Sequence, residues 1–251
     1  MYAIRNAGAK GLGVFAVKNI KRGTRILAER PLLSLKSERD AYKASLQLPP
    51  DDRTWFLTEL TLNKTKARSV ADLASSSWNL LRSGIWPSAA VLAEHDAALA
   101  VFKNNNYDIG GGTQWLLRDC SRLNHACVPN SQGNMNTAAG QFCVHAVKPI
   151  NEGDEVTVSY MDEFGGPRES RQRSLYESHG FTCACPICDS TTELGRRTEA
   201  RRTEVSKKIW HFAEQAQTRS EPDIEGELRL VRTLIESFEA DGLAGRELST
   251  M

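Results

Sequence analysis

The stretch that most constrains the fold of this chain is DCSRLNHACVPN, residues 119–130. Asn124, His125 and Asn130 lie close to Pro129, between apolar flanks, and the strand-like run QFCVHAV follows them. Amide and imidazole side chains packed this densely beside a proline favour a rigid, partly buried recognition loop over a solvated one. The rest of the chain must therefore supply partners for this loop.

A second polar stretch, FTCACPICD at residues 181–189, carries three thiols in a C-x-C-x-x-C pattern. Three thiolates at this spacing can wrap one tetrahedral ion, and zinc is the common metal for sulfur ligands in reducing compartments. A structural site of this kind needs four ligands, so the fourth comes from elsewhere in the chain. The alternative is three thiols that bind no metal.

The fourth ligand can be chosen from a short set of thiols and one imidazole, namely Cys120, Cys127, Cys143 and His179. Cys127 is favoured because a ligand there would pin the polar loop to the cysteine stretch. Cys120 and Cys143 lie in apolar contexts, and we expect them to be buried free thiols. The predicted metal ligands are Cys127, Cys183, Cys185 and Cys188.

Composition excludes several classes of protein. The chain has 251 residues, which is enough for one large domain with an appendage. Of these, 25% are charged and the net charge is only +1, so no overall electrostatic attraction draws the protein to nucleic acid or membrane. No apolar run approaches the ~20 residues of a membrane span, and the N-terminus lacks the apolar core of a signal peptide. Six cysteines in such a chain favour free thiols or metal ligands over disulfides. We expect an intracellular monomer, nuclear or cytoplasmic.

The first part of the chain has two successive patterns of apolar residues. Residues 1–35 have the pattern of β structure, with GVFAV and TRILAE as strands. Residues 36–102 change to helical periodicity in DDRTWFLTEL, where the Asp residues are expected to cap, and in SVADLASSSWNLLRSGI and SAAVLAEHDAALAVF. This segment predicts a helical insertion within a β domain, with His95 solvated or capping rather than a ligand. Three tryptophans are expected on apolar core faces: Trp55, Trp78 and Trp86.

The second part begins with KNNNYDIGGGTQWLL, whose Asn and Gly runs indicate irregular backbone near a polar site, or an exposed loop. QFCVHAV and EVTVSY alternate as strands, and GPRESRQRSLYESHGF predicts a basic amphipathic helix before the cysteines. SKKIWHFAEQA and IEGELRLVRTLIESFEA predict two further helices. The charge run RRTEARRTEVSKK is interpreted as one solvated helix face with pairs at four-residue spacing.

Taken together, these pieces resemble the SET-domain protein lysine methyltransferases. The resemblance covers residues 1–36 and 103–189 through KGLGVFA, RLNHACVPN, EGDEVTVSY and FTCACPIC, in that order. The loop matches the family's N-H-x-C-x-P-N, and the cysteines match its post-SET C-x-C-x-x-C. The HGFTCACPIC junction and the helices after it resemble the SET-and-MYND branch and its fungal relatives. No cysteine precedes Cys120, so the MYND finger is expected to be absent.

The resemblance implies an α+β fold, mainly β, with small sheets and a knot-like C-terminal threading. A helical insertion, a zinc-binding post-SET segment and C-terminal helices complete it. The implied domains are 1–36 and 103–166 for the two parts of the SET domain, 37–102 for the insertion, 167–190 for the post-SET segment and 191–251 for the C-terminal helices. In the SET-and-MYND branch a larger helical domain covers the substrate cleft, so the chain either has a short lid or is truncated.

The resemblance also implies a function, the transfer of a methyl group from S-adenosyl-L-methionine to a lysine of a histone tail or another protein. Tyr160 matches the catalytic tyrosine, and Tyr107 and His179 would border the channel for the target lysine. His179 stands where many relatives have an aromatic residue, which leaves the degree of methylation open. The residues implied in cofactor binding are Lys10, Gly11, Leu12, Gly13, Asn105, Ser121, Arg122, Asn124, His125, Tyr160, His179 and Phe181.

Two other functions are open at this stage. A catalytically inactive SET module could act as a protein-binding scaffold, and its support is His179 together with the missing finger. Nucleic-acid binding through the cysteine stretch and the basic segment 196–208 is disfavoured, because the net charge is near zero and aromatic residues are not interleaved with the basic ones.

Overall fold

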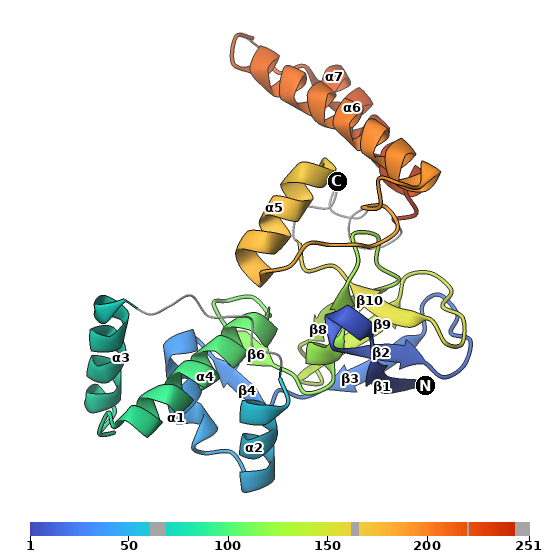
Figure 1. Cartoon of the computed structure of the whole chain (residues 1–251). Helices are drawn as coiled ribbons and strands as arrows, with labels where there is room; N and C mark the ends of the chain where they lie inside the picture. Colours follow the sequence, from blue (N-terminus) through green and yellow to red (C-terminus); the bar gives the residue numbers. More distant parts are fainter. Residues whose placement is uncertain (61–68, 162–165, 220, 244–251) are drawn as a thin grey trace.

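The computed structural model describes residues 1–60, 69–161, 166–219 and 221–243. It is a mixed α+β fold, as predicted, with three small sheets at its centre (Figure 1). Four helices of the insertion lie on one side of the sheets, and the C-terminal helices lie on another (Figure 1). No helix in these residues is both long enough and apolar enough to span a bilayer.

The first sheet brings the polar loop against the strand before Tyr160. Its order is β1 (Tyr2–Asn6), β2 (Leu12–Ala16), β10 (Glu155–Val158) and β7 (Asn124–His125). The β10–β7 pair is parallel, with Thr157 opposite Asn124 and Val158 opposite His125, and the other two pairs are antiparallel.

Asn130 reinforces this pairing from the far end of the loop. Its side-chain Nδ2 donates to the carbonyl of Glu155 at 2.8 Å, and its Oδ1 accepts from the amide of Thr157 at 2.8 Å. One amide side chain thus satisfies a backbone donor and a backbone acceptor of β10, as a neighbouring strand would.

Two antiparallel three-stranded sheets complete the β structure. One consists of β3 (Arg25–Glu29), β9 (Gln141–Ala146) and β8 (Ser131–Asn136). The other consists of β4 (Leu33–Leu35), β6 (Gln114–Leu116) and β5 (Asn106–Asp108). The strands predicted from GVFAV, TRILAE, QFCVHAV and EVTVSY are confirmed as β2, β3, β9 and β10. Their inward residues form one core, in which Val14, Val144 and Val156 are fully buried.

Glu29 anchors the start of the polar loop. Its carboxylate accepts hydrogen bonds from the amides of Asp119 at 3.0 Å and Cys120 at 3.1 Å, and from the amide of Arg118. Tyr2 also donates its hydroxyl proton to the Asp119 carboxylate. One charged side chain therefore satisfies three consecutive backbone donors where the chain enters the loop.

The helical insertion is confirmed and consists of α1 (Ala41–Ser45), α2 (Pro50–Thr58), α3 (Val70–Arg82) and α4 (Ala89–Asn105). Ser69 and Asp72 form a capping box on α3. The expectation that Asp residues cap α2 was wrong, because the helix begins at Pro50 and its two Asp residues lie in the first turn. There they favour the helix through the positive end of its dipole.

Three side chains of the insertion differ from expectation. Trp78 and Trp86 are 62% and 78% exposed. Helix α3 turns Ser76 and Leu80 inward and leaves Trp78 on its outer face, and Trp86 lies beyond the end of this helix. Trp55 is half-buried. His95 is neither solvated nor a cap: it is buried in the middle of α4, with its ring edge-on to Tyr42.

The C-terminal part contains α5 (Arg168–His179), α6 (Glu193–Ala216) and α7 (Ile224–Ala240). The charge run is part of α6, and pairs such as Glu204–Lys208 form at the predicted four-residue spacing. However, the run is not one solvated face. Arg202 is fully buried, and its Nε lies 2.6 Å from a carboxylate oxygen of Asp241.

A first prediction concerns Glu29. Glu29→Ala would leave three loop amides without their acceptor, so we expect the free energy of unfolding to fall by about 1–3 kcal/mol. Urea unfolding measures this change, and Glu152→Ala in an exposed turn is the matched control. Equal stability of the two variants would contradict the anchoring role.

Candidate functional site

Tyr160 is the centre of an aromatic cluster built from distant parts of the chain. It follows β10, and its ring centroid lies 4.9 Å from that of His179 and 5.4 Å from that of His125. Phe181 completes the cluster, 6.3 Å from Tyr160 and nearly perpendicular to it. The structure thus brings together four residues that the sequence singled out separately.

A cavity of about 270 Å³ opens beside this cluster. Tyr160, Tyr107 and His179 all line it, so the two residues expected to border a lysine channel share one cavity with the expected catalytic tyrosine. The Tyr107 hydroxyl is held by the carbonyl of Cys120 at 2.6 Å, and its ring packs on Phe142. The cavity therefore has aromatic walls whose positions are fixed by hydrogen bonds and packing.

The Tyr160 hydroxyl has a defined partner and a defined protonation state. It donates to the carbonyl of Leu123 at 2.7 Å. Burial raises the pKa of this phenol above its ordinary value, and the negative charge of Glu155 raises it further. The hydroxyl therefore keeps its proton at neutral pH and can orient a ligand, but it is a poor general base.

His125 links Tyr160 to the cysteine stretch. Its Nδ1 accepts from the backbone amide of Tyr160 at 3.0 Å, and its Nε2 lies 3.3 Å from Sγ of Cys127. Burial lowers the pKa of His125 to about 4, so the ring is neutral at physiological pH.

Residues expected to bind a cofactor meet around Glu155. Nδ2 of Asn124 donates to Glu155 Oε1 at 2.7 Å and to the carbonyl of Leu12 at 3.1 Å, and Lys10 forms an ion pair with Glu155. A Cβ on Gly13 would lie 2.7 Å from Glu155 Oε1 and 2.9 Å from Asn124 Nδ2, so this glycine permits the close approach. Gly11 adopts φ +79°, which also favours glycine.

Glu155 itself was not predicted as a site residue. It lies opposite Phe15 in the β10–β2 pair, and this register brings its side chain to Gly13 and Lys10. The signal in the sequence was a carboxylate in the first position of an alternating strand, and a solvated strand end has the same signal.

Three other predicted cofactor residues are placed differently. Asn105, at the end of α4, and Ser121 both line the Tyr160 cavity, and the Ser121 hydroxyl donates to the Asn105 carbonyl at 3.2 Å. The Asn105 side chain donates to the carbonyl of Val101 at 2.8 Å. Arg122 does not join the group around Asn124: it is buried, and its guanidinium lies over the Trp55 ring at 5.5 Å.

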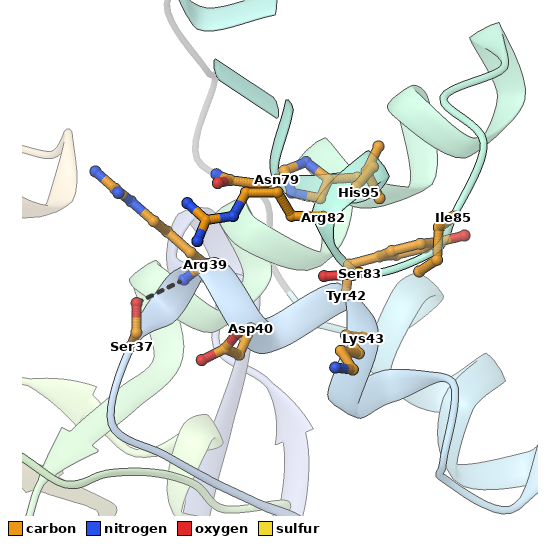
Figure 2. Close-up of a pocket in the computed structure, with 11 residues that line it drawn as sticks. Ser37, Arg39, Asp40, Tyr42, Lys43, Asn79, Arg82, Ser83, Ile85 and His95 are labelled. Atoms are coloured by element: carbon orange, nitrogen blue, oxygen red, sulfur yellow. Dashed lines mark hydrogen bonds between the residues drawn. The ribbon is translucent and has the colours of Figure 1, made fainter. Parts of the chain in front are cut away.

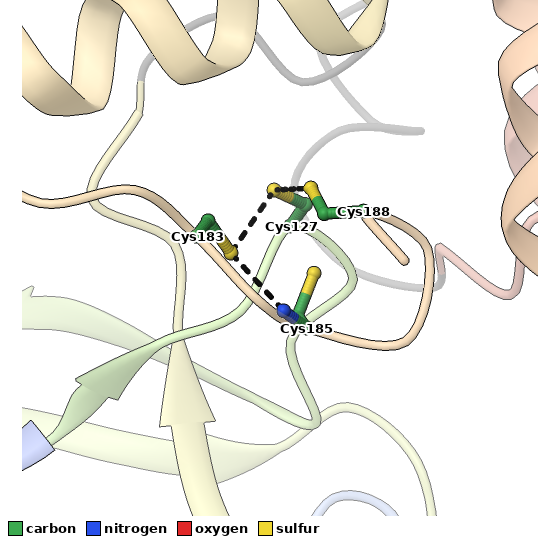
Figure 3. Close-up of side chains that lie close together, drawn as sticks. All are labelled: Cys127, Cys183, Cys185 and Cys188. Atoms are coloured by element: carbon green, nitrogen blue, oxygen red, sulfur yellow. Dashed lines mark hydrogen bonds between the residues drawn. The ribbon is translucent and has the colours of Figure 1, made fainter. Parts of the chain in front are cut away.

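The four cysteines predicted as metal ligands lie together, with all their sulfur atoms within 4.8 Å of one another (Figure 3). Sγ of Cys127 is 3.6 Å from that of Cys188 and 3.9 Å from that of Cys183. A tetrahedral ion with metal–sulfur bonds of about 2.3 Å requires sulfur–sulfur edges of about 3.8 Å. The donor set and its spacing therefore fit such an ion, while Cys120 and Cys143 are buried free thiols elsewhere, as predicted.

Helix α5 holds this cluster through two residues that the sequence did not single out. Gln172 pairs with Cys183 as a strand would, donating to its carbonyl and accepting from its amide, each at 2.7 Å. Arg171 is 2% exposed, and its guanidinium donates to Sγ of Cys188 at 3.4 Å and to the carbonyl of Gly166 at 2.6 Å. A buried cation beside thiolates offsets their negative charge.

A second cavity, of about 240 Å³, lies within the helical insertion (Figure 2). Its walls carry Arg39, Lys43 and Arg82, and the side chains of Arg39 and Lys43 point in different directions (Figure 2). It shares no lining residue with the Tyr160 cavity, so we do not assign it to the functional site.

Comparison with known proteins places this geometry in context. The family model described as "SET domain" matches residues 11–161. The histone-lysine N-methyltransferase set5 of Schizosaccharomyces pombe is 28% identical over 179 residues, which cover 71% of this chain and 47% of that protein. The protein-lysine N-trimethyltransferase SMYD5 of Gallus gallus is 32% identical over 80 residues, which cover 31% of this chain and 19% of that protein. The chain thus spans less than half the length of these relatives.

Among solved structures, that of Rubisco LSMT bound to sinefungin and monomethyllysine is similar in fold. The TM-score is 0.50 with 12% sequence identity, and the match covers 73% of this chain and 52% of the other.

A second prediction follows from Arg171. Arg171→Met removes the buried cation while keeping an extended side chain, and we expect the affinity for Zn²⁺ or Co²⁺ to fall about 10- to 100-fold, as for other outer partners of metal ligands. Competition with a chromophoric chelator measures it. Arg173→Met, on the exposed side of the same helix, is the control. Identical affinities of the two variants would mean that the guanidinium does not stabilise the site.

Proposed function

The chain belongs to the SET domain family, and from this premise we propose that it is a protein-lysine N-methyltransferase that uses S-adenosyl-L-methionine. The observation that carries the proposal is the position of Tyr160. It lines one cavity with Tyr107 and His179, and it lies two residues after the strand that pairs with Asn124 and His125. One tyrosine thus adjoins both the expected lysine channel and the expected cofactor residues.

The reaction requires alignment more than acid–base chemistry. The neutral lysine nitrogen would form a bond to the methyl carbon while the carbon–sulfur bond of the sulfonium breaks and its electron pair stays on sulfur. The proton that the lysine gives up beforehand would pass to solvent. A lysine with pKa near 10.4 must first become neutral, and an aromatic channel beside a positive sulfonium favours the neutral amine. The protonated Tyr160 hydroxyl can then orient that amine.

The residues around Glu155 would hold the amino-acid part of the cofactor, which supplies the methyl group when bound. Asn124 donates both of the hydrogen bonds given above through its Nδ2. Its Oδ1 would therefore be the atom that accepts a hydrogen bond from the ammonium group of the cofactor. Phe181, next to Tyr160 and His125, offers an aromatic face for adenine.

The metal in the four-cysteine cluster is proposed to be Zn²⁺ in a structural role. It would tie the segment that carries Phe181 to the loop that carries Asn124, and so would assemble the cofactor pocket from two distant stretches. The parallel β7–β10 pair supports the knot-like threading of a SET fold, and the β2–β10 pair supports joining residues 1–36 and 103–166 in one domain.

The substrate is proposed to be a histone tail or another protein that presents a lysine in the nucleus or cytoplasm. The name of the fission-yeast relative supports histone, and the name of the SMYD5 relative supports a protein lysine more broadly. A catalytically inactive protein-binding module is the second candidate, and it is favoured by His179 in a channel position where many relatives have an aromatic residue.

A third prediction tests the mechanism. Tyr160→Phe removes the hydroxyl but keeps the ring, and we expect the methyl-transfer rate to fall about 10²- to 10³-fold, the usual effect of losing one oriented donor. Turnover is measured with labelled cofactor on a set of histones and other proteins, and circular dichroism monitors folding. Unchanged turnover in the folded variant would refute the role of Tyr160.

A fourth prediction separates enzyme from inactive module. Calorimetric titration of the metal-loaded chain with S-adenosylmethionine should give binding that is lost in Asn124→Ala, because that side chain supplies the acceptor for the cofactor's ammonium. Gln47→Ala, at an exposed position of the helical insertion, is a control outside both the Asn124 group and the Tyr160 cavity. Binding without turnover on any protein would favour the inactive module.

A further inference from the structure

We propose that His125 is a positioning residue that couples the Cys127 thiolate to the backbone of Tyr160, so that alignment of the catalytic tyrosine depends on the state of one metal ligand. The inference rests on the proposed function, because it takes Tyr160 as the catalytic residue. It assigns a path between the four-cysteine cluster and the Tyr160 cavity that consists of two hydrogen bonds through one ring.

The direction of both hydrogen bonds follows from the geometry. A backbone amide can only donate, so Nδ1 of His125, 3.0 Å from the Tyr160 nitrogen, is the acceptor and carries no proton. The ring proton is therefore on Nε2, which lies 3.3 Å from Sγ of Cys127. The bond to Tyr160 thus determines the tautomer, and this tautomer points a donor at the metal ligand.

The strength of the second bond depends on the sulfur. A metal-bound thiolate is a charged acceptor, whereas a thiol is a weak one. His125 is 5% exposed and packs against the rings of both Tyr160 and Phe181, so water has little access to its Nε2–H. Loss of the thiolate would leave a buried donor with a poor acceptor, and the ring would then lose the interaction that orients it.

The position of Tyr160 depends directly on the orientation of the His125 ring. The last backbone bond of the β7–β10 pair is the one from Ala126 to Val158, and Tyr160 lies two residues beyond it. Its amide donates to His125, and its hydroxyl donates to Leu123. Tyr160 is thus anchored at its amide and at its hydroxyl, and the anchor of the amide passes through the ring that contacts Cys127.

The adjacent positions of Asn124 and His125 explain how one short strand serves two sites. Successive side chains of a strand point to opposite faces. Asn124 therefore faces Glu155 and the carbonyl of Leu12, while His125 faces Cys127. The two-residue strand β7 thus has the expected cofactor group on one face and the metal cluster on the other.

The first experiment compares two cysteine variants by hydrogen exchange of the Tyr160 amide, in the metal-loaded 251-residue chain. Cys127→Ala removes the sulfur that contacts His125 and leaves no acceptor in its place, and Cys185→Ala removes a different ligand of the same cluster. We expect amide exchange at Tyr160 to accelerate about tenfold in Cys127→Ala, the size of one lost hydrogen bond, and to change much less in Cys185→Ala. Equal effects of the two variants, or no effect in either, would overturn the coupling.

The second experiment replaces the ring. His125→Phe keeps an aromatic ring but makes neither hydrogen bond, whereas His125→Gln can accept from Tyr160 and donate to Cys127. We expect faster Tyr160 exchange and a lower kcat in the Phe variant at unchanged metal content, with partial recovery of both in the Gln variant. His211→Phe on the exposed side of α6 is the control. Full protection of Tyr160 in His125→Phe would overturn the proposal.

The two readouts keep this inference separate from the proposed function. Amide exchange at Tyr160 and metal content are measured without any turnover, so they test the coupling even in an inactive protein. If Tyr160→Phe retains full activity while Cys127→Ala still loosens the Tyr160 amide, the coupling holds and the catalytic role fails. The reverse result retains the enzyme and rejects the coupling.

Discussion

The parallel pairing of β7 with β10 is the interaction on which the rest of the site depends. It joins a two-residue strand in the polar loop to the strand before Tyr160, with Val158 opposite His125. A pair this short has few backbone bonds of its own, and the side chain of Asn130 supplies two more to β10. Glu29 fixes the entrance of the same loop. Charged and amide side chains therefore provide the stability that a longer strand would provide through its backbone.

The sequence alone predicted the features that ligand chemistry or strand alternation restricts to few possible structures. Three thiols at C-x-C-x-x-C spacing need a fourth partner, and the choice of Cys127 agrees with the cluster that forms. Four of the strands, β2, β3, β9 and β10, followed from alternation, and the order of the motifs indicated the family. These features depend on residues close in sequence or on a strong chemical requirement, so no tertiary information was needed.

Features decided by packing were not predictable from local pattern. Trp78 and Arg202 show this in opposite directions, since an aromatic residue expected in the core is exposed and a charge expected in solvent is buried against Asp241. Glu155 and Arg171 were missed for the same reason. A carboxylate at a strand start and an arginine on a basic helix look solvated until the strand register, or the helix face, is known.

Charge compensation explains why Arg171 and Glu155 belong to the site. Four thiolates around one divalent ion would leave a net negative charge in a buried place, and Arg171 supplies a buried positive charge beside Cys188. On the other face of β7, Glu155 holds Lys10 and Asn124. Burial raises the pKa of the Tyr160 phenol, and the charge of Glu155 raises it further. On the cysteine face of β7, His125 holds the backbone of this tyrosine, which keeps its proton and so suits the proposed reaction, one governed by alignment.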